Sequence, residues 1–370
     1  MKCICIAHNF TENSFAAMSY NLSYKLASLG NRVLFISHRP RFEKPLKIPV
    51  NQGEILVYSW PSEKRPTNFK SFLWYLKLYL KFKPSITIGH FVGSNITGAV
   101  SKILSLFKNT TIVYYHTLSS QINTDNNSKS IIQQFRFIRK KIFYEIFCDS
   151  IICPSPLAKI DLHKTYFTKK GVVIVNPMLD RKINEVADKS KSNYTISYLG
   201  RIDKSKNVEF LVFAFIEFKM KNPTIPLKLR IAGAGSESKK IKEITNKYQF
   251  IEYLGFLPYT EIDKFIQSSD FMIIPSLHDN LPTVGLESLM NGTPLLLSNQ
   301  TGLAFFLTDS YDSFIFEPTK DGILNVLERA TKDFETINTL KINCRKTYKK
   351  YFTMDSYYDK MIEHIEHLTR

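Results

Sequence analysis

The sequence contains no apolar run that approaches the roughly 18–20 residues of a membrane-spanning helix. The apolar segment at the start, residues 3–7, is too short for a secretory signal and is typical of a first buried strand. We therefore expect a protein that stays in the cytoplasm and crosses no membrane.

Cysteine is scarce, and no two cysteines have the spacing of a zinc site or of a thioredoxin motif. Three of them lie in or beside strand-like runs, which favours small buried side chains in a reducing compartment over a disulfide framework. A catalytic cysteine is the less favoured alternative. The five residues are Cys3, Cys5, Cys148, Cys153 and Cys344.

Acidic residues are few in the first half of the chain. Residues 1–180 contain 24 Lys and Arg against 9 Asp and Glu, whereas residues 181–370 contain 26 against 24. Nearly all of the net charge of +17 therefore belongs to the first half. A basic half favours an anionic partner, namely a membrane surface, a phosphorylated acceptor or a nucleic acid. No recognised nucleic-acid-binding motif is present.

Short apolar strands alternate with amphipathic helical patterns along both halves of the 370 residues. This alternation predicts an α/β fold with parallel sheets in two doubly wound, Rossmann-like domains, with ligands at the carboxyl ends of the strands. The polar residues 180–194 form the predicted linker between domains of residues 1–180 and 181–354. Strands are predicted at residues 3–7, 32–37, 55–59, 86–90, 111–116, 150–153, 172–175, 195–199, 227–232, 251–254, 271–274 and 294–298.

The most informative stretch follows the strand at residues 271–274. A polar loop opens a helix at about Val284, and two acids eight positions apart, Asp279 and Glu287, lie in the loop and in the first turns of the helix. A helix N-terminus suits an anion such as phosphate, and carboxylates accept hydrogen bonds from hydroxyls. Phosphate together with several hydroxyls describes a nucleotide-sugar.

This segment resembles the acid-x7-acid signature of the retaining GT-B glycosyltransferases of glycosyltransferase family 4, with Asp279 in place of the usual first Glu. The resemblance is strongest over residues 195–297. It implies a GT-B fold of two Rossmann-like domains facing a central cleft, with a terminal helix at residues 355–370 that crosses back to the first domain. By the same resemblance, Glu287 holds the ribose hydroxyls and Asp279 holds the transferred sugar.

The resemblance extends to other segments of the second half. Arg201 and Lys206 match a Gly-Arg pattern followed by a Lys, and their charges would stabilise a leaving diphosphate. Gly233 begins a Gly-x-Gly turn after a strand. Phe256 and Leu257 match the segment that holds the nucleobase, although Phe256 is as readily explained by core packing. The predicted donor-binding residues are Arg201, Lys206, Gly233, Phe256, Leu257, Asp279, Asn280, Leu281, Thr283 and Glu287.

Three departures from the family pattern affect the details. Pro282 has no N–H where the family often has Gly, so the Asn280 side chain or the amides of Leu281 and Thr283 would have to bind the donor. The acid that commonly follows the next strand is missing, while Gly302 preserves the turn. Residues 9–14 replace the glycine pair that family members carry after the first strand.

In the first half, His116 matches a family position where a His faces the transferred sugar; a strand-end His bonded to a neighbouring loop is the alternative. His90 is interpreted as structural or close to the acceptor, and His278 as a donor-pocket residue. Two helices carry much of the basic charge, at residues 69–83 and 128–147. Basic residues beside aromatics mark interfacial membrane helices, and also helices packed on a sheet with a solvated basic face. The residues assigned to the acceptor and membrane side are Arg136, Arg139, Lys140 and Lys141.

The function that this resemblance implies is transfer of a sugar from a nucleotide-sugar, UDP favoured over GDP, to a lipid-linked or glycan acceptor in cell-surface polysaccharide assembly. His116, Asp279, Arg201 and Lys206 would carry the catalysis. The chain contains no Asp-x-Asp triplet, the usual metal site of GT-A enzymes, so no cofactor or metal is expected. The protein would bind the inner face of the membrane peripherally. A nucleotide-sugar 2-epimerase and, less favoured, a basic nucleic-acid-binding protein are the alternatives.

Overall fold

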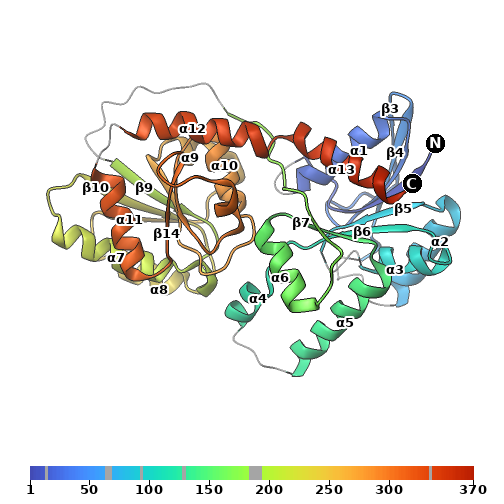
Figure 1. Cartoon of the computed structure of the whole chain (residues 1–370), viewed down its shortest axis with the longest axis horizontal. Helices are drawn as coiled ribbons and strands as arrows, with labels where there is room; N and C mark the ends of the chain where they lie inside the picture. Colours follow the sequence, from blue (N-terminus) through green and yellow to red (C-terminus); the bar gives the residue numbers. More distant parts are fainter. Residues whose placement is uncertain (13–15, 63–68, 92–94, 127–130, 183–193, 333–335) are drawn as a thin grey trace. The chain divides into compact units, whose positions relative to one another are not determined.

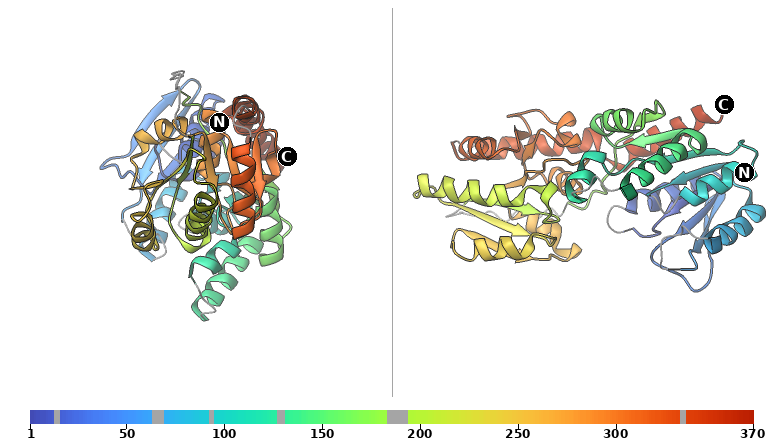
Figure 2. Two further views of the ribbon diagram at one scale, coloured as in Figure 1. Left: turned by 90° about the vertical axis from the view of Figure 1, so that its left-hand side faces the viewer. Right: turned by 90° about the horizontal axis from the view of Figure 1, so that it is seen from below.

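A computed structural model of the chain describes residues 1–12, 16–62, 69–91, 95–126, 131–182, 194–332 and 336–370. The chain forms two compact units, each of which is an α/β body with helices on the faces of one sheet (Figures 1 and 2). Unit 1 consists of Met1–His116, Ser128–Pro177 and Met354–Arg370, and unit 2 of Thr117–Asn127 and Met178–Thr353. Residues 183–193 of the predicted linker lie outside the described residues.

Unit 1 contains an eight-stranded sheet in the order β3-β4-β2-β1-β5-β6-β7-β8. Its strands pair in parallel, except that β3 is antiparallel to β4. The strand order reverses between β1 and β5, which is the topological switch point where open α/β sheets bind ligands. The strands are β1 (Cys3–His8), β2 (Arg32–Ser37), β3 (Leu46–Val50), β4 (Gly53–Ser59), β5 (Ile86–Gly89), β6 (Thr110–Tyr114), β7 (Ser150–Cys153) and β8 (Gly171–Val173).

Side chains alternate between the two faces of this sheet, so each strand contributes to two cores. Ile4 and Ile6 of β1 belong to a core shared with α1 and α13, whereas Cys5 and Ala7 belong to a core shared with α2 and α3. The helices of unit 1 are α1 (Ala17–Ser28), α2 (Phe69–Phe82), α3 (Asn95–Leu104), α5 (Ile131–Phe147), α6 (Pro156–Tyr166) and α13 (Met354–Leu368).

Unit 2 contains a six-stranded sheet in the order β11-β10-β9-β12-β13-β14, in which neighbouring strands pair in parallel. Its switch point lies between β9 and β12. The strands are β9 (Tyr194–Leu199), β10 (Leu227–Ala232), β11 (Ile251–Gly255), β12 (Phe271–Ile274), β13 (Leu295–Ser298) and β14 (Ser313–Phe316). The helices are α4 (Ser119–Asn126), η3 (Lys204–Lys206), α7 (Val208–Lys221), α8 (Ser238–Thr245), η4 (Tyr259–Glu261), α9 (Ile262–Gln267), α10 (Thr283–Asn291), η5 (Gly302–Phe306), α11 (Lys320–Lys332) and α12 (Thr336–Tyr351).

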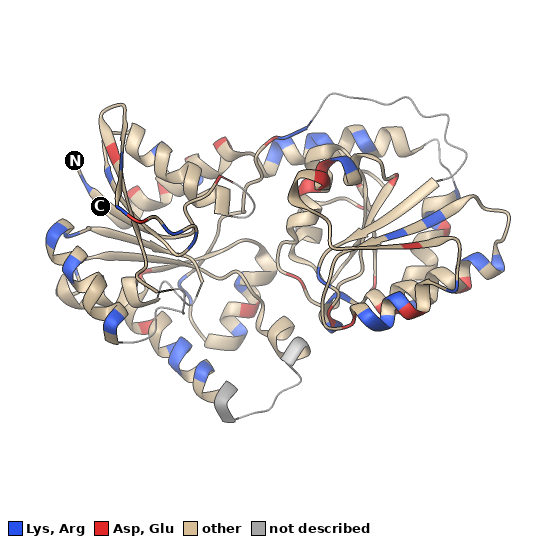
Figure 3. Ribbon diagram, turned by 180° about the vertical axis from the view of Figure 1, so that it is seen from behind, with Lys and Arg blue, Asp and Glu red and all other residues tan. Residues whose placement is uncertain are grey.

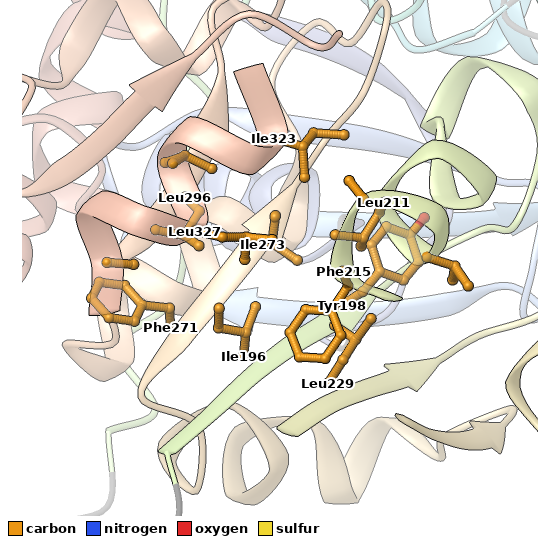
Figure 4. Close-up of a cluster of buried hydrophobic side chains, with 14 of the residues drawn as sticks. Ile196, Tyr198, Leu211, Phe215, Leu229, Phe271, Ile273, Leu296, Ile323 and Leu327 are labelled. Carbon is orange, nitrogen blue, oxygen red and sulfur yellow. The ribbon is translucent and has the colours of Figure 1, made fainter. Parts of the chain in front are cut away.

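The core of unit 2 lies between the central strands and the helices α7 and α11 (Figure 4). Ile196 of β9 and Ile273 of β12 pack there with Phe215 of α7 and Leu327 of α11, and each is at most 1% exposed. This packing fixes the carboxyl ends of β9 and β12 side by side. The loops that carry the predicted donor residues leave the sheet from those ends.

The predicted α/β fold with two doubly wound sheets is confirmed, and the structure adds two edge strands, β3 and β14, that the sequence patterns do not indicate. All five cysteines are unpaired thiols. Burial raises the pKa of Cys5 to about 12 and also raises the pKa values of Cys148 and Cys344, which opposes reactive thiolates. Among the described residues, no helix is long and apolar enough to span a membrane.

Candidate functional site

Two loops at the carboxyl edge of the unit 2 sheet meet beside the switch point. The backbone N–H of Leu277, after β12, donates to the carbonyl of Ser205 in η3 at 2.8 Å. This contact brings the Lys206 ammonium to 2.5 Å from Asp279 Oδ2, and both side chains are largely buried. The structure therefore joins a predicted phosphate-binding cation to a predicted sugar-binding acid, although they lie far apart in the sequence.

Arg201 lies at the exposed side of the same edge. Its side chain is 58% exposed and its guanidinium donates to Asp203. Asp203 in turn accepts hydrogen bonds from the backbone N–H and the hydroxyl of Ser236, at 2.9 and 3.0 Å. Asp203, which the sequence patterns did not single out, thus connects the loop after β9 to the loop after β10 and leaves Arg201 accessible to an anion.

Gly233 permits a close approach of two backbones. Its φ is +139°, and a Cβ there would lie 1.8 Å from the carbonyl oxygen of Gly200. Its N–H donates to the carbonyl of Gly255 at 2.6 Å, so this amide is already used within the fold. Gly233 therefore shapes the donor loops, and its predicted role as a direct donor ligand stays a prediction.

The predicted base-binding segment follows β11. Phe256 is 79% exposed and does not pack in the core, while Leu257 is half-buried. An aromatic ring that a strand end holds in solvent is available to flank a planar base.

The acid-x7-acid segment forms a buried loop that leads into α10. Asp279 is 9% exposed and Asn280 3%, while Leu281 is buried and Thr283 is the first residue of the helix. Pro282 precedes the helix and makes no side-chain capping bond, so the helix N-terminus keeps the character of an anion site. The carbonyl of Asp279 accepts a bond from the Gly302 N–H at 3.0 Å, which ties the loop to η5. His278 is half-buried beside it.

Glu287 of α10 is buried and paired with Arg181, a residue that the sequence patterns missed. Arg181 Nη2 lies 3.2 Å from Glu287 Oε1, and the guanidinium also makes a bidentate contact with Asp263 at 2.9 and 3.1 Å. Burial raises the pKa of Glu287 to about 7, with the nearby charge of Arg181 opposing that rise. The acid assigned to the ribose therefore titrates near neutral pH.

With Glu287 in its predicted ribose-binding role, this raised pKa predicts a donor affinity that depends on pH. Only the carboxylate form accepts from both ribose hydroxyls, so the affinity for a nucleotide-sugar should rise with pH; a pKa near 7 gives about tenfold weaker binding at pH 6 than at pH 8. Calorimetry with a nucleotide-sugar measures the affinity at the two pH values. The diphosphate of the ligand keeps its charge between pH 6 and pH 8, so the ligand itself adds no pH dependence. The control, Glu287→Gln, should remove the dependence. An affinity equal at both pH values would contradict the assignment.

In unit 1, His116 follows β6 and its Nε2 lies 3.1 Å from His90 Nδ1. Burial lowers the pKa of His116 to about 3, and the nearby Lys140 adds to that effect. His90 is fully buried, and burial lowers its pKa as well. The structure thus brings His116 and His90 together as neutral side chains.

Figure 3 colours the Lys and Arg positions along α5 blue. The surroundings of these basic side chains differ. Arg136, Arg139 and Lys141 are exposed. The ammonium of Lys140 instead lies 5.4–5.8 Å from the ring centroids of Tyr115, Tyr144 and Tyr166, and burial lowers its pKa to about 8. Lys140 is therefore part of an internal aromatic cluster, unlike the three exposed cations.

The apolar face of α5 points to solvent rather than into the core. Phe135, Ile138, Ile142 and Ile146 recur at helical spacing and are 75%, 55%, 48% and 51% exposed. The opposite face, with Phe143 and Tyr144, packs inward. A helix that exposes both an apolar stripe and flanking cations has the composition of an interfacial helix.

The described residues contain no group of three or more His, Cys, Asp or Glu side chains placed to hold a metal ion. The site as described consists of cations, carboxylates, backbone amides and an exposed aromatic ring. This set is suited to binding an anion that carries hydroxyls and a planar base.

Comparison with known proteins gives two family matches, which meet at the boundary between the halves. The model of Glycosyltransferase Family 4 matches residues 16–181, and that of Glycosyl transferases group 1 matches residues 180–347. A UDP-Gal:alpha-D-GlcNAc-diphosphoundecaprenol alpha-1,3-galactosyltransferase of Escherichia coli is 23% identical over 310 residues, which are 80% of this chain and 78% of that protein. Three uncharacterized glycosyltransferases, two of Methanocaldococcus jannaschii and one of Haemophilus influenzae, are 24–26% identical, and the chain spans 40–55% of their length.

Solved structures resemble the whole chain. A sucrose-phosphate synthase of Thermosynechococcus elongatus has a TM-score of 0.78 at 17% identity, covering 100% of this chain and 99% of that one. HepE of Anabaena, in complex with UDP-glucose, has a TM-score of 0.72 at 12% identity and covers 99% of both chains. At these identities the likeness establishes the fold.

Proposed function

Since the chain has the GT-B fold and belongs to the glycosyltransferases of family 4, we propose that it transfers a sugar from a nucleotide-sugar, UDP favoured over GDP, to a lipid-linked or glycan acceptor in cell-surface polysaccharide assembly. The observation that carries this proposal is the contact of Lys206 with Asp279 at the switch point of unit 2, ahead of α10. The relative from Escherichia coli is named for a UDP-sugar and a diphosphoundecaprenol-linked acceptor, and HepE binds UDP-glucose; these names support the donor and acceptor classes. Transfer is favoured over 2-epimerisation because the relatives are glycosyltransferases.

In this proposal the donor's diphosphate lies against Arg201 and Lys206 at the start of α10. The ammonium of Lys206 has three N–H donors, so its contact with Asp279 leaves others for a phosphate oxygen. As the glycosidic bond breaks, the leaving diphosphate gains charge, which both cations stabilise. Asp279 holds the hydroxyls of the transferred sugar, Glu287 those of the ribose, and Phe256 flanks the base.

A thermal-shift screen of UDP- and GDP-sugars, with the bare nucleotides alongside, tests the donor. A ligand that binds only the folded state raises the melting temperature by mass action. We expect UDP-sugars to give the largest shifts. The absence of a shift with every nucleotide-sugar at millimolar concentration would refute the proposal.

We further propose that transfer retains the anomeric configuration and needs no divalent metal, because Arg201 and Lys206 supply the positive charge that a metal would give. The leaving phosphate would take the acceptor's proton. Proton NMR of the product should show retention, and activity should survive EDTA. An inverted product, or loss of activity in EDTA with rescue by magnesium, contradicts this.

We propose that unit 1 meets the acceptor at an anionic membrane surface through α5, with the protein peripheral at the inner face. The exposed stripe of Phe135, Ile138, Ile142 and Ile146 would enter the interface, while Arg136, Arg139 and Lys141 would meet anionic headgroups.

Neutralising Arg136, Arg139 and Lys141 together, with glutamine at each, should weaken binding to anionic vesicles about 10²-fold at low salt, since each basic residue contributes about 1 kcal/mol there. Vesicle co-sedimentation measures this. Lys140 is left in place because its ammonium packs against tyrosine rings. The matched control variant has glutamine in place of three exposed lysines of unit 2, and it should bind the vesicles as the native protein does. These lysines are Lys228, Lys242 and Lys247. If the native protein does not bind anionic vesicles at low salt, a soluble anionic acceptor is the better explanation of the positive charge in the first half of the chain.

A further inference from the structure

Two carboxylates share one guanidinium beside the predicted ribose-binding acid of unit 2. Arg181 Nη2 lies 3.1 Å from Asp263 Oδ1 and 3.2 Å from Glu287 Oε1, so one amino group of the guanidinium donates to both acids. Arg181 Nε donates to Asp263 Oδ2 at 2.9 Å. We call Asp263, Arg181 and Glu287 the acid–arginine–acid triad.

The two acids of the triad are held unequally. Asp263 accepts two hydrogen bonds from Arg181 and a third, at 2.9 Å, from Nδ2 of Asn291. The side-chain oxygen of Asn291 in turn accepts a bond from Gln267 at 2.8 Å. The carboxylate of Glu287 accepts one bond from Arg181, at Oε1. Asp263 therefore binds the guanidinium more firmly than Glu287 does.

Glu287 keeps one carboxylate oxygen for a ligand. Its side chain is 4% exposed, and within the described part of the chain its Oε2 makes no hydrogen bond to a protein group. Buried polar atoms of folded proteins nearly always have a hydrogen-bond partner, from the protein or from outside it. A hydroxyl of a bound ligand would supply that partner at Oε2.

The charges that act on Glu287 come from two of the elements around α10. The strands β12 and β13, which pack against α10, contribute buried and mostly apolar side chains. Burial raises the pKa of Glu287 most, the charge of Arg181 lowers it, and the charge of Asp263 raises it. The charged and titratable side chains placed against α10 or the triad are Tyr259 of η4, Asp263 of α9, Arg345 of α12, and Asp180 and Arg181 of the segment before residue 183.

We propose that Arg181 and Asp263 are positioning residues for the donor. Arg181 fixes Oε1 of Glu287 and leaves Oε2 for a ribose hydroxyl, while Asp263 shares the guanidinium and so limits the positive charge that reaches Glu287. The two residues thereby set the pH at which Glu287 becomes a carboxylate. The link to the ribose rests on the function proposed above, whereas the effect of the triad on the charge of Glu287 does not.

This arrangement predicts opposite effects for the two neighbours of Glu287. Without the charge of Asp263, Glu287 has Arg181 to itself and loses a like charge, so its carboxylate form persists to lower pH. Without Arg181, Glu287 loses its counter-charge, so the carboxylate forms only at higher pH. A role in packing alone would not change sign between the two variants.

The first test follows Glu287 in the full-length protein without ligand. Glutamate labelled with 13C at its side-chain carboxyl reports the titration of each residue, and Glu287→Gln identifies the signal of Glu287. We expect a midpoint near pH 7 in the native protein, one lower by about one pH unit or more in Asp263→Asn, and one higher by about the same amount in Arg181→Met. Midpoints that agree in all three proteins, or that move in the same direction in both variants, would overturn the proposal.

Matched controls remove the same charges from exposed neighbours. Glu261 lies on η4 shortly before Asp263, and Lys182 directly follows Arg181. Neither Glu261→Gln nor Lys182→Met should move the midpoint. If Arg181→Met does not fold because the half-buried Asp263 has lost its cation, Asp263→Asn decides alone, and a midpoint that stays or rises in that variant contradicts the proposal.

Binding of UDP-glucose separates this inference from the proposed function. A change of one pH unit in the midpoint alters the ionised fraction of Glu287 about fivefold, at pH 6 in Asp263→Asn and at pH 7 in Arg181→Met. We therefore expect calorimetry to show about fivefold tighter binding at pH 6 in the first variant and about fivefold weaker binding at pH 7 in the second. If the midpoints move as expected and the affinities do not follow, the triad still controls the charge of Glu287, and it is the ribose-binding role of Glu287 that fails.

Discussion

Replacing Arg201 or Lys206 by alanine is expected to lower kcat about 10²-fold or more, the usual cost of removing one charge partner from a transition state. The reason is that both cations are assigned to the leaving diphosphate in the proposed donor site, where negative charge develops as the glycosidic bond breaks. Arg201 gives the cleaner result, since its side chain is exposed and its pairing with Asp203 at the surface contributes little to stability. Steady-state kinetics with saturating donor measure the effect.

Lys204→Ala is the matched control, because Lys204 belongs to the same short helix as Lys206 but is exposed and makes no described contact with the acid pair. It should keep near-native kcat. Lys206→Ala also leaves the buried Asp279 without its cation, so its melting temperature must be measured beside its rate. A folded Arg201→Ala enzyme with near-native kcat would contradict the assignment of the diphosphate site.

The strands that the sequence did not predict are both at sheet edges. β3 contains Lys47 and Pro49, and β14 has only four residues. Edge strands need only one hydrogen-bonding neighbour, so they tolerate proline and charge and lose the continuous apolar pattern of buried parallel strands. The central strands are buried on both faces, and their patterns therefore predicted the α/β fold.

The donor residues were predicted from a motif, but their partners were not. A motif places Lys206 after one strand and Asp279 after another; only the parallel order of β9 beside β12 brings the two together. Arg181 lies at the edge of a polar linker, where no local pattern distinguishes it from other cations. Its role is visible only because α10 places Glu287 against it.

Periodicity also does not distinguish cations on one helix. The pattern of α5 predicted equivalent roles for its four basic residues. The ammonium of Lys140, however, lies against three tyrosine rings, namely Tyr115 directly after β6, Tyr144 of α5 and Tyr166 of α6. The hydrogen bonds that connect His8, Ser19, His90 and His116 were missed for the same reason. His8, Ser19 and His90 come from three elements, and the sequence shows no spacing that relates them to His116.

Replacing Asp279, in the loop before α10, and replacing Glu287, on α10, should have different effects on ligand binding. Glu287→Ala should weaken both the nucleotide-sugar and the bare nucleotide, by roughly 1.5–3 kcal/mol or about 10- to 140-fold, because both ligands contain the ribose. Arg181 keeps its bidentate contact with Asp263 in this variant, so the fold should survive.

Asp279→Ala should weaken the nucleotide-sugar by a similar factor but leave the bare nucleotide bound at near-native or slightly higher affinity. The reason is that Asp279 is assigned to the sugar, and its removal frees the ammonium of Lys206 for the diphosphate. Calorimetry with both ligands gives the four affinities, and Glu243→Ala, an exposed acid on α8, should change none of them. If each of the two variants weakens both ligands equally, Asp279 and Glu287 do not divide the donor between sugar and ribose, and the acid pair acts on the nucleotide as one unit.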